Sequence, residues 1–394
     1  MRRIFGLVPN VFFLGLVSLF NDFSSEMVYS VMPAFLTVVL GVPPVFIGFL
    51  EGFADALASF LKIFAGWFSD RIGKRKILSV LGYALSTLTR FVLSLVANFW
   101  QVFVLRALDR VGKGFRDSPR DALISESVEK SELGKSFGYH RAMDAIGGIL
   151  GPLAAVILLS VLSGDYRLLF IIGGIFGFLS VLSFVFVRDI PKPANAPLPR
   201  VPFTLSLKGF GQDFKLLILS IFIFGLGVMP ISLMLLQSQN VGFNSVGIPL
   251  MYFVYGLSFL LFAIPFGKIS DRIGEGKVLV MGFLAAIVSY IIFARFSNPA
   301  GLIVGFVIFG LYSAMTEGVQ KALASKLASG EKLATGQGFL NAAVGISSLL
   351  SGIVGGLIWT LFGSALAFVY GIVLMSLGLL TFLIYNKRYG KNRY

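Results

Sequence analysis

The sequence predicts an all-helical polytopic membrane protein with twelve transmembrane helices in two pseudo-symmetric six-helix bundles. The first observation behind this prediction is composition. Of the 394 residues, 56% are hydrophobic and only 13% are charged, about half the charged share of a soluble domain. The second is a series of apolar stretches long enough to cross a bilayer. The third is that short phrases of the first half return in the second.

A transmembrane helix needs about 20 mostly apolar residues, and we expect one at each of twelve stretches. In the first half these are 10–40, 44–69, 77–97, 99–118, 136–160 and 166–187. In the second half they are 216–240, 245–268, 278–296, 300–320, 336–360 and 363–386. The segment between them is rich in proline and basic residues, which is typical of a connection. We therefore expect a first bundle at 1–187, a linker at 188–215, and a second bundle with a short basic tail at 216–394.

Lysine and arginine gather in alternate loops of this predicted topology, including both termini and the linker. Because positively charged loops stay inside, we expect the termini and the linker in the cytoplasm and the chain in the inner membrane of a prokaryote. The formal charge of +14 then reflects topology, and we expect no nucleic-acid partner. The first apolar stretch contains Asn21, Asp22 and Glu26, which favours a retained helix over a signal peptide.

Three phrases support an internal repeat. S-D-R-I-G begins at Ser69 and again at Ser270, 201 residues later. Related A-L-x-S phrases begin at Ala122 and Ala322, and V-M-P occurs at 31–33 and at 228–230. The offsets agree, so the halves are related. Parallel repeats of this kind occur in transporters.

The repeated S-D-R-I-G phrase lies between the second and third spans of each half. Asp70 ends a helix, where it can pair with Arg71 or cap a neighbouring helix. Gly73 can adopt the positive φ of a sharp turn. A generic tight turn with topology charges is the alternative, and the duplication makes it less attractive.

The first copy resembles the loop signature of the major facilitator superfamily, roughly G-x-x-x-D-R-x-G-R/K-R/K. The matching residues are Gly66, Asp70, Arg71, Gly73, Lys74 and Arg75. The second copy matches at Asp271, Arg272 and Gly274, and then has Glu275 and Gly276 in place of the basic pair. The resemblance covers the whole chain. It implies a monomeric transporter that works by alternating access, with Asp70 helping to lock the cytoplasmic side in the outward-facing state.

Two further motifs resemble parts of that family. Gly138, Gly147, Gly151 and Pro152 match the G-x8-G-x3-G-P pattern associated with antiporters, mainly drug exporters. Close helix packing and a bend at the proline are the alternative interpretation. Arg106 matches the arginine of a fourth-span signature, roughly R-x-x-x-G-x-G, for which a role in proton transfer is implied.

Charged residues inside the spans are candidates for function, because each costs about 2.5–3.5 kcal/mol at a helix centre on insertion scales. Most lie in the first half: Asp22, Glu26, Glu51, Asp55, Lys62, Arg106, Asp109, Arg110, Lys113, His140, Arg141 and Asp144. Arg116, Asp117, Arg120 and Asp121 are expected near the boundary, solvated or in gate ion pairs. Burial raises the proton affinity of a carboxylate and nearby cations lower it, so a carboxylate whose surroundings alternate can carry a proton. Asp22 and Glu26 are the first candidates, then Glu51 and Asp55; the competing interpretation is a fixed ion network.

The sequence thus favours a proton-coupled exporter of an amphipathic or cationic small molecule. Proton-coupled uptake, and export of a metal cation bound by carboxylates, stay open. The chain has no cysteine and only His140 as histidine, which argues against a soft-metal site, and we expect no metal centre and no cofactor. An intramembrane enzyme is disfavoured because neither H-E-x-x-H nor G-x-S-x-G occurs.

Overall fold

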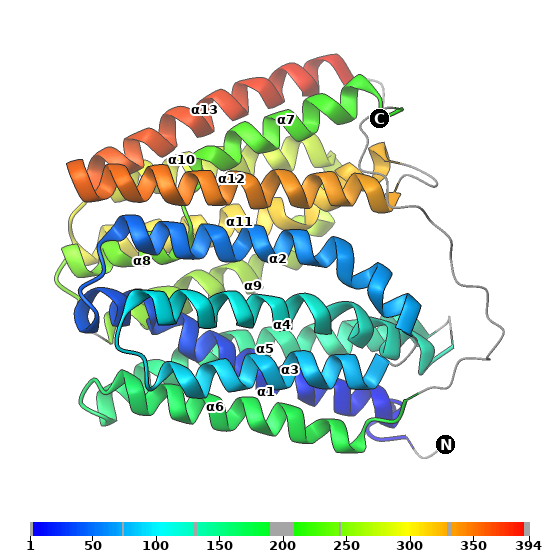
Figure 1. Cartoon of the computed structure of the whole chain (residues 1–394). Coiled ribbons are helices and arrows are strands. Elements are labelled where there is room, and N and C mark those ends of the chain that lie inside the picture. The colour runs from blue at the N-terminus through cyan, green and yellow to red at the C-terminus, as the bar shows by residue number, and fades with distance from the viewer. Residues whose placement is uncertain are drawn as a thin grey trace. The chain divides into compact units, whose positions relative to one another are not determined.

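The computed structural model describes residues 3–72, 75–129, 132–189, 209–243, 246–328 and 333–389; for 62–72, 333 and 334 it describes the backbone only. The first half contains α1 (Pro9–Ala34), the π-helical turn η1 (Phe35–Val39), α2 (Pro44–Ile72), α3 (Arg75–Leu93), α4 (Phe99–Glu126), α5 (Leu133–Val161), α6 (Tyr166–Ser183) and the 3-10 turn η3 (Phe184–Phe186) (Figure 1). The second half contains α7 (Gln212–Gly227), α8 (Ile231–Asn240), α9 (Gly247–Ile273), α10 (Glu275–Arg295), α11 (Pro299–Leu327), α12 (Leu333–Phe362) and α13 (Ser364–Tyr389). Within these ranges the one β feature is an isolated bridge between Ile4 and Leu7.

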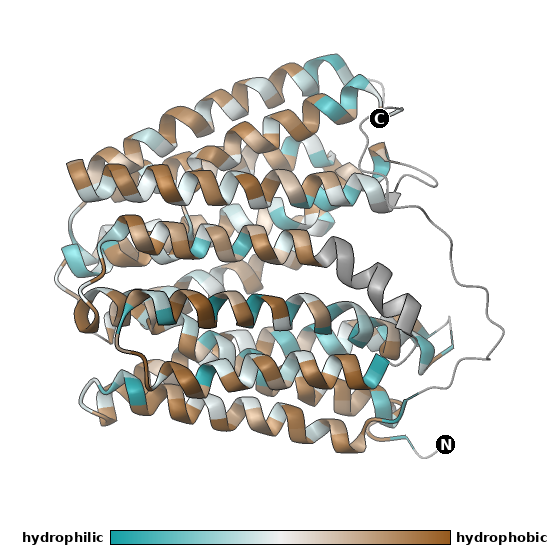
Figure 2. Cartoon of the chain, in the orientation of Figure 1, coloured by the Kyte–Doolittle hydropathy of each residue, from teal (hydrophilic) through white to brown (hydrophobic). Residues whose placement is uncertain are grey.

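Eleven stretches of the described helices are long and apolar enough to cross a membrane, and α7 and α8 together form one of them. The exception is α4, which carries charged residues at intervals from Arg106 to Asp121. Figure 2 shows these hydrophilic positions interspersed along an otherwise apolar helix. Since α4 packs along α3, it supplies the twelfth span. The predicted all-helical fold with twelve transmembrane helices is therefore confirmed.

Short polar side chains start corresponding helices of the two halves. The Asn98 side chain accepts a hydrogen bond from the Gln101 N–H at the start of α4, and that of Asn298 accepts one from the Gly301 N–H at the start of α11. Each cap satisfies a backbone donor that has no partner within its own helix. The two asparagines are 200 residues apart, so the repeat extends to the positions where helices begin.

Contacts group the chain into two units. The first unit comprises Met1–Phe35 and Phe60–Val201, and the second comprises Leu36–Ser59 and Pro202–Tyr394. The first part of α2 thus belongs to the second unit, where it packs on α12: a Cβ on Gly52 would lie 2.7 Å from the Cα of Leu349. The bundle limits expected from the sequence, 1–187, 188–215 and 216–394, stay a prediction.

Inside the first unit, α1 packs on α5 and α6, and α3 packs on α4 and α6. Gly82 of α3 and Gly112 of α4 meet, because a Cβ added to either would lie 2.7 Å from the carbonyl oxygen of the other. Backbones that approach this closely leave polar side chains of adjoining turns within hydrogen-bond reach. The candidate site is built from such side chains.

Candidate functional site

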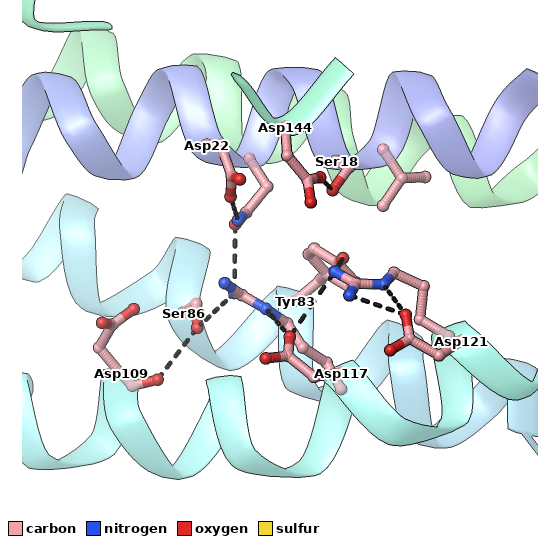
Figure 3. Close-up of polar contacts among 12 residues, drawn as sticks. Ser18, Asp22, Tyr83, Ser86, Asp109, Asp117, Asp121 and Asp144 are labelled. Carbon is pink, nitrogen blue, oxygen red and sulfur yellow. Dashed lines mark hydrogen bonds and ion pairs between the residues drawn. The ribbon is translucent and has the colours of Figure 1, made fainter. Parts of the chain in front are cut away.

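A buried asparagine on α1 joins the charged side chains of three helices. Asn21 is 1% exposed, and its Oδ1 accepts hydrogen bonds from Arg90 Nη2 (3.0 Å) and Arg116 Nη1 (3.2 Å). Guanidinium groups only donate, so the amide oxygen faces them and the amide nitrogen is left to donate to Asp22 Oδ1 at 2.8 Å. Asn21 therefore holds Asp22 beside the cations of α3 and α4. Figure 3 shows Asp22 among the polar side chains of this cluster.

Arg90 is a central member of this cluster that the sequence analysis did not single out. It is 3% exposed on α3, and its Nη1 donates to Ser24 Oγ at 2.9 Å. Its Nη2 lies 3.8 Å from Asp109 Oδ1. The available sequence signal was a lone arginine within the apolar stretch 77–97, which by the cost of an intramembrane charge belonged with the other candidates.

Arg116 continues the cluster on α4. Its Nη1 donates to Ser86 Oγ at 3.0 Å, and its guanidinium carbon lies 4.5 Å from the ring centre of Tyr83. Its Nε is 3.7 Å from Asp117 Oδ1. Arg116 is buried and lies in an ion pair, so of the two alternatives expected for it the structure shows the ion pair and not exposure to solvent. Packing of α3 directly on α4 covers it.

Ion pairs then extend from Asp117 toward the end of α4. Arg120 lies 3.7 Å from Asp117 and donates to Asp121 Oδ1 at 2.8 Å and to the Tyr83 hydroxyl oxygen at 3.2 Å. Residues three and four apart on a helix are neighbours on its surface. The Asp121 side chain is 48% exposed, so the series of charges runs from the buried cluster to an open surface of the first unit.

Tyr29 of α1 lies under two arginines of α4. The guanidinium carbon of Arg106 is 4.3 Å from the Tyr29 ring centre, and that of Arg110 is 5.9 Å away. Arg106 Nη1 is also 3.5 Å from Asp109 Oδ2. Guanidinium groups over an aromatic face are stabilised by the ring quadrupole, which gives these cations a defined position in the interior of the unit.

A small pocket of about 20 Å³, room for about one water molecule, lies beside this tyrosine. Val28, Met32, Leu93 and Leu105 line it with apolar side chains. Tyr29, Arg90, Arg106 and Asp109 line it with polar ones. An apolar wall with a few convergent polar groups is typical of small-molecule sites, but the space itself is water-sized in this conformation.

A second cluster joins α1 and α5. Ser18 Oγ donates a hydrogen bond to Asp144 Oδ1. The other oxygen of Asp144 is 3.5 Å from His140 Nδ1 and 3.5 Å from Arg141 Nη1. The structure thus brings together the three residues of α5 that the sequence proposed as candidates, and places Asp144 one turn from the level of Asp22.

Two of the glycines in the antiporter-like motif sit where α5 touches α1. A Cβ on Gly147 would lie 2.5 Å from the Leu19 carbonyl oxygen and 3.2 Å from the Cβ of Asp22. A Cβ on Gly151 would lie 2.6 Å from the Phe23 carbonyl oxygen and 3.2 Å from the Cβ of Glu26. Gly138 faces open space, and Pro152 lies inside α5. The motif therefore positions α5 against the two acidic turns of α1.

The other carboxylate candidates lie in the second unit. Glu51 is buried, and Asp55 Oδ2 accepts a hydrogen bond from Ser348 Oγ at 3.0 Å. These two thus belong to a different unit from the other candidates, which are Asp22, Glu26, Arg106, Asp109, Arg110, His140, Arg141 and Asp144. Among the described residues, no group of three or more histidine or acidic side chains is arranged to hold a metal ion.

In the first loop copy only the backbone is described for Gly66, Asp70 and Arg71, and Gly73 and Lys74 fall outside the described residues. The side chain of Lys62, earlier on α2, also falls outside them. Arg75 is described, and its Nη1 lies 2.9 Å from Glu126 Oε1. In the second copy Asp271 and Arg272 are exposed, and Gly274 has a φ of +97° that favours glycine. Glu275, which follows it, pairs with Lys326.

Comparisons with known proteins agree with this fold. The sequence profile of the Major Facilitator Superfamily matches residues 14–247 and 216–393. An uncharacterized MFS-type transporter of Methanocaldococcus jannaschii, MJ1317, is 34% identical over 94% of this chain and 95% of its own. The multi-drug resistance efflux pump PmrA of Streptococcus pneumoniae is 26% identical over 77% of each chain. The crystal structure of the nucleoside transporter NupG superposes with a TM-score of 0.76 at 16% identity, covering 98% of this chain and 99% of the other.

Twelve spans in two related halves, with a charged cluster buried in one of them, define a polytopic membrane transporter. The chain belongs to the Major Facilitator Superfamily. The resemblance inferred from the loop signature is thereby confirmed.

Proposed function

We propose that this transporter exports an amphipathic or cationic small molecule in exchange for protons, and that Asp22 carries the proton. The observation that carries the proposal is the position of Asp22, which is hydrogen-bonded by Asn21. Lys113, Arg116 and Asp144 are the charged groups that act on it most strongly. A carboxylate inside a membrane protein must be paired or protonated, so its charge depends on which of these neighbours it faces.

The protonation of Asp22 is connected to helix packing through Asn21. An ionised Asp22 accepts the Asn21 amide hydrogen bond and attracts the cations of α3 and α4, whereas a neutral carboxyl attracts them less. Protonation therefore changes the relative stability of arrangements that differ in these contacts, which is the requirement for a ligand-driven population shift. The amphipathic pocket beside Tyr29 lies on the same three helices, so substrate and proton can act on one network.

Relatives support export. PmrA is named a multi-drug resistance efflux pump, and MdtG of Salmonella paratyphi C, 28% identical over 60% of this chain and 59% of its own, is named a multidrug resistance protein. We further propose that the chain acts as a monomer in a prokaryotic inner membrane. The basic loops favour a cytoplasmic location for both termini and the linker.

Proteoliposomes test the proposal with ethidium as the cationic probe, 8-anilinonaphthalene-1-sulfonate as an anionic probe, and pyranine as the internal pH reporter. The wild-type protein should move protons against ethidium and leave the anionic probe untransported. Asp22→Asn should remove ethidium-driven proton movement and keep exchange of ethidium across the membrane without a pH gradient. The matched control is Glu129→Gln, which neutralises an exposed acidic residue of the same unit and should behave as the wild type.

Two results would contradict the proposal. Normal proton coupling in Asp22→Asn would make Asp22 a structural charge and would transfer the test to Glu26, Glu51 and Asp55. Transport of the anionic probe but not of ethidium by the wild-type protein would overturn the proposed substrate class.

A further inference from the structure

The packing of α1 on α5 sets two rows of polar side chains side by side. Along α1, Ser18 lies one turn before Asp22; along α5, Asp144 lies about one turn before Gly147. Gly147 meets the backbone beside Asp22, and Ser18 donates to Asp144. The two helices are therefore in register, and Asp144 lies one turn from Asp22, toward the end where α1 and α5 begin. Figure 3 shows both carboxylates directed toward α3 and α4.

His140 occupies the next turn of α5 in the same direction. It is 2% exposed, and its Nδ1 is 3.5 Å from Asp144 Oδ2. Its Nε2 is buried and has no hydrogen-bond partner among the described residues. A buried polar atom without a partner costs free energy, so an imidazole with a carboxylate 3.5 Å from one nitrogen and no hydrogen-bond partner at the other calls for an explanation beyond packing.

The charged groups around His140 connect it to an exposed surface. Those that act on it are Arg120, Asp117 and Asp121 of α4, together with Arg141 and Asp144 of its own helix. The Asp121 side chain is 48% exposed and that of Arg141 is 81% exposed. Asp22, Asp144, His140 and Asp121 therefore follow one another from the interior of the first unit to its open end.

We propose that Asp144 and His140 form the proton pathway between Asp22 and the end of the first unit at which α1 and α5 begin. This inference rests on the proposed role of Asp22 as proton carrier. It assigns His140 and Asp144 to proton movement and leaves the substrate to the pocket beside Tyr29.

The chemistry requires only proton transfer. A proton leaves the Asp22 carboxyl and binds the Asp144 carboxylate, by way of the Ser18 hydroxyl or a water molecule. Asp144 then passes it to one nitrogen of the neutral imidazole, and the imidazolium releases a proton from its other nitrogen toward Asp121 and solvent. An imidazole can bind a proton at one nitrogen and release one from the other, so the imidazolium is a transient carrier, and every step is reversible.

The single histidine of the chain allows a test that needs no substrate. Protein with isotope-labelled histidine, in lipid bilayers, gives one imidazole signal in solid-state NMR. We expect Asp144→Asn and Asp22→Asn each to change the tautomer populations or the titration of that signal. Tyr139→Phe, which removes a hydroxyl from the adjacent position of α5, should leave it unchanged. If neither Asp22→Asn nor Asp144→Asn changes the tautomer populations or the titration of the imidazole signal, the pathway is wrong.

Transport assays distinguish a failure of the pathway from a failure of the proposed function. His140→Gln and Asp144→Asn should slow ethidium-driven proton movement about tenfold or more, the scale of a lost proton-transfer group. Ethidium exchange without a pH gradient should stay near the wild-type rate.

If both variants couple like the wild type, the pathway is wrong and the role of Asp22 stands. If the wild-type protein moves no protons with ethidium, the proposed function fails, and the NMR response of His140 to Asp22→Asn alone decides the pathway. If His140→Gln does not fold, Asp144→Asn provides the same test.

Discussion

The α3–α4 pair of the first unit and the α10–α11 pair of the second occupy equivalent positions of the repeat. Their buried side chains differ: they are charged in the first pair and mostly apolar or aromatic in the second. Arg90, Asp109 and Arg116 of the first pair correspond, 200 residues on, to Tyr290, Phe309 and Thr316. The first set forms ion pairs and hydrogen bonds with α1 and with each other. In the second set, Tyr290 is fully buried, and its ring centre lies 6.3 Å from that of Phe309. The second helix pair holds together without charged residues at these positions, and the variants below test whether the charges of the first pair serve coupling or only stability.

The two halves also differ between α1 and its counterpart, which is α7 together with α8. Both segments contain V-M-P, yet α1 continues through Pro33 while the second unit breaks between Gly227 and Ile231. Proline removes a backbone donor and disturbs the carbonyl four residues earlier. In the second unit Gly225 and Gly227 precede it and weaken the helix further. The hydroxyl of Tyr370 donates to the freed Leu226 carbonyl at 3.0 Å.

Tyr290 completes the break in the second unit. Its hydroxyl oxygen accepts a hydrogen bond from the Met229 N–H at 2.8 Å. Tyr290, at the position equivalent to Arg90, thus hydrogen-bonds to the backbone, whereas Arg90 hydrogen-bonds to side chains. Equivalent positions of the repeat thus make different contacts, and the variants below test whether they also have different functions.

The largest effect is expected from Arg90→Met. It removes the donor to Asn21 and Ser24 and the cation beside Asp109. Breaking a buried pair by removing one partner costs about 3–5 kcal/mol. The midpoint of thermal unfolding in detergent should fall sharply, and proton-coupled ethidium transport should be lost.

The double variant Arg90→Met with Asp109→Leu separates stability from function. Replacing a whole buried pair by apolar residues is often neutral or stabilising, and the second unit shows that this framework accepts apolar side chains here. We expect the double variant to regain much of the stability and none of the proton coupling. Recovery of transport would show that the charges are structural, as the fixed-network interpretation holds.

A smaller effect is expected where α5 meets α1. A methyl group at Gly147 would press on the Leu19 carbonyl, whereas Gly138 has nothing within 4 Å. Gly147→Ala should destabilise the protein by about 1–3 kcal/mol through overpacking and impair coupling at Asp22. Gly138→Ala should be neutral or stabilising by up to about 1 kcal/mol, because alanine suits a helix better than glycine. Unfolding midpoints of the two variants, measured together, should move in opposite directions; equal losses would contradict the assigned packing.

These sites also show what the sequence could and could not predict. The spans, the repeat and the acidic turns of α1 follow from hydropathy and from the cost of charge in a membrane. Arg90 was missed although a lone arginine in an apolar stretch is itself a signal, because its partners Asn21 and Asp109 come from other helices and the sequence does not show that they meet. The break at Gly227 was missed because the apolar run continues through it. Which of the motif glycines touch α1 depends on helix register, which spacing alone does not determine.

An effect on stability of the same order, with less consequence for coupling, is expected from the ion pairs at the helix ends. Arg75 pairs with Glu126 in the first unit, and Glu275 pairs with Lys326 at the positions 200 residues later. The charges of the ion pair are exchanged between the units at these helix ends. Arg75→Glu should destabilise the first unit by about 1–3 kcal/mol, because it opposes two carboxylates and removes a charged hydrogen bond.

Adding Glu126→Lys to Arg75→Glu gives the first unit the arrangement that the second already has. The double variant should recover most of the unfolding midpoint and of the transport rate. If it stays as unstable as Arg75→Glu alone, the two pairs are not equivalent and the repeat does not extend to these contacts.

The smallest effect is expected in the loop copies, where Asp70→Asn is compared with Asp271→Asn. Asp70 stands in the complete signature, and the charge of a helix-terminal aspartate stabilises a neighbouring helix end by about 0.3–1 kcal/mol. Asp271 is exposed, and its copy lacks the basic pair. We therefore propose that Asp70→Asn weakens the outward-facing state by that amount, while Asp271→Asn changes it less. Spin labels at the end of α4 and the end of α11 report the distance distribution between the units. A larger open fraction in Asp70→Asn than in Asp271→Asn supports the gate, whereas identical distributions in both variants and the wild type would remove it.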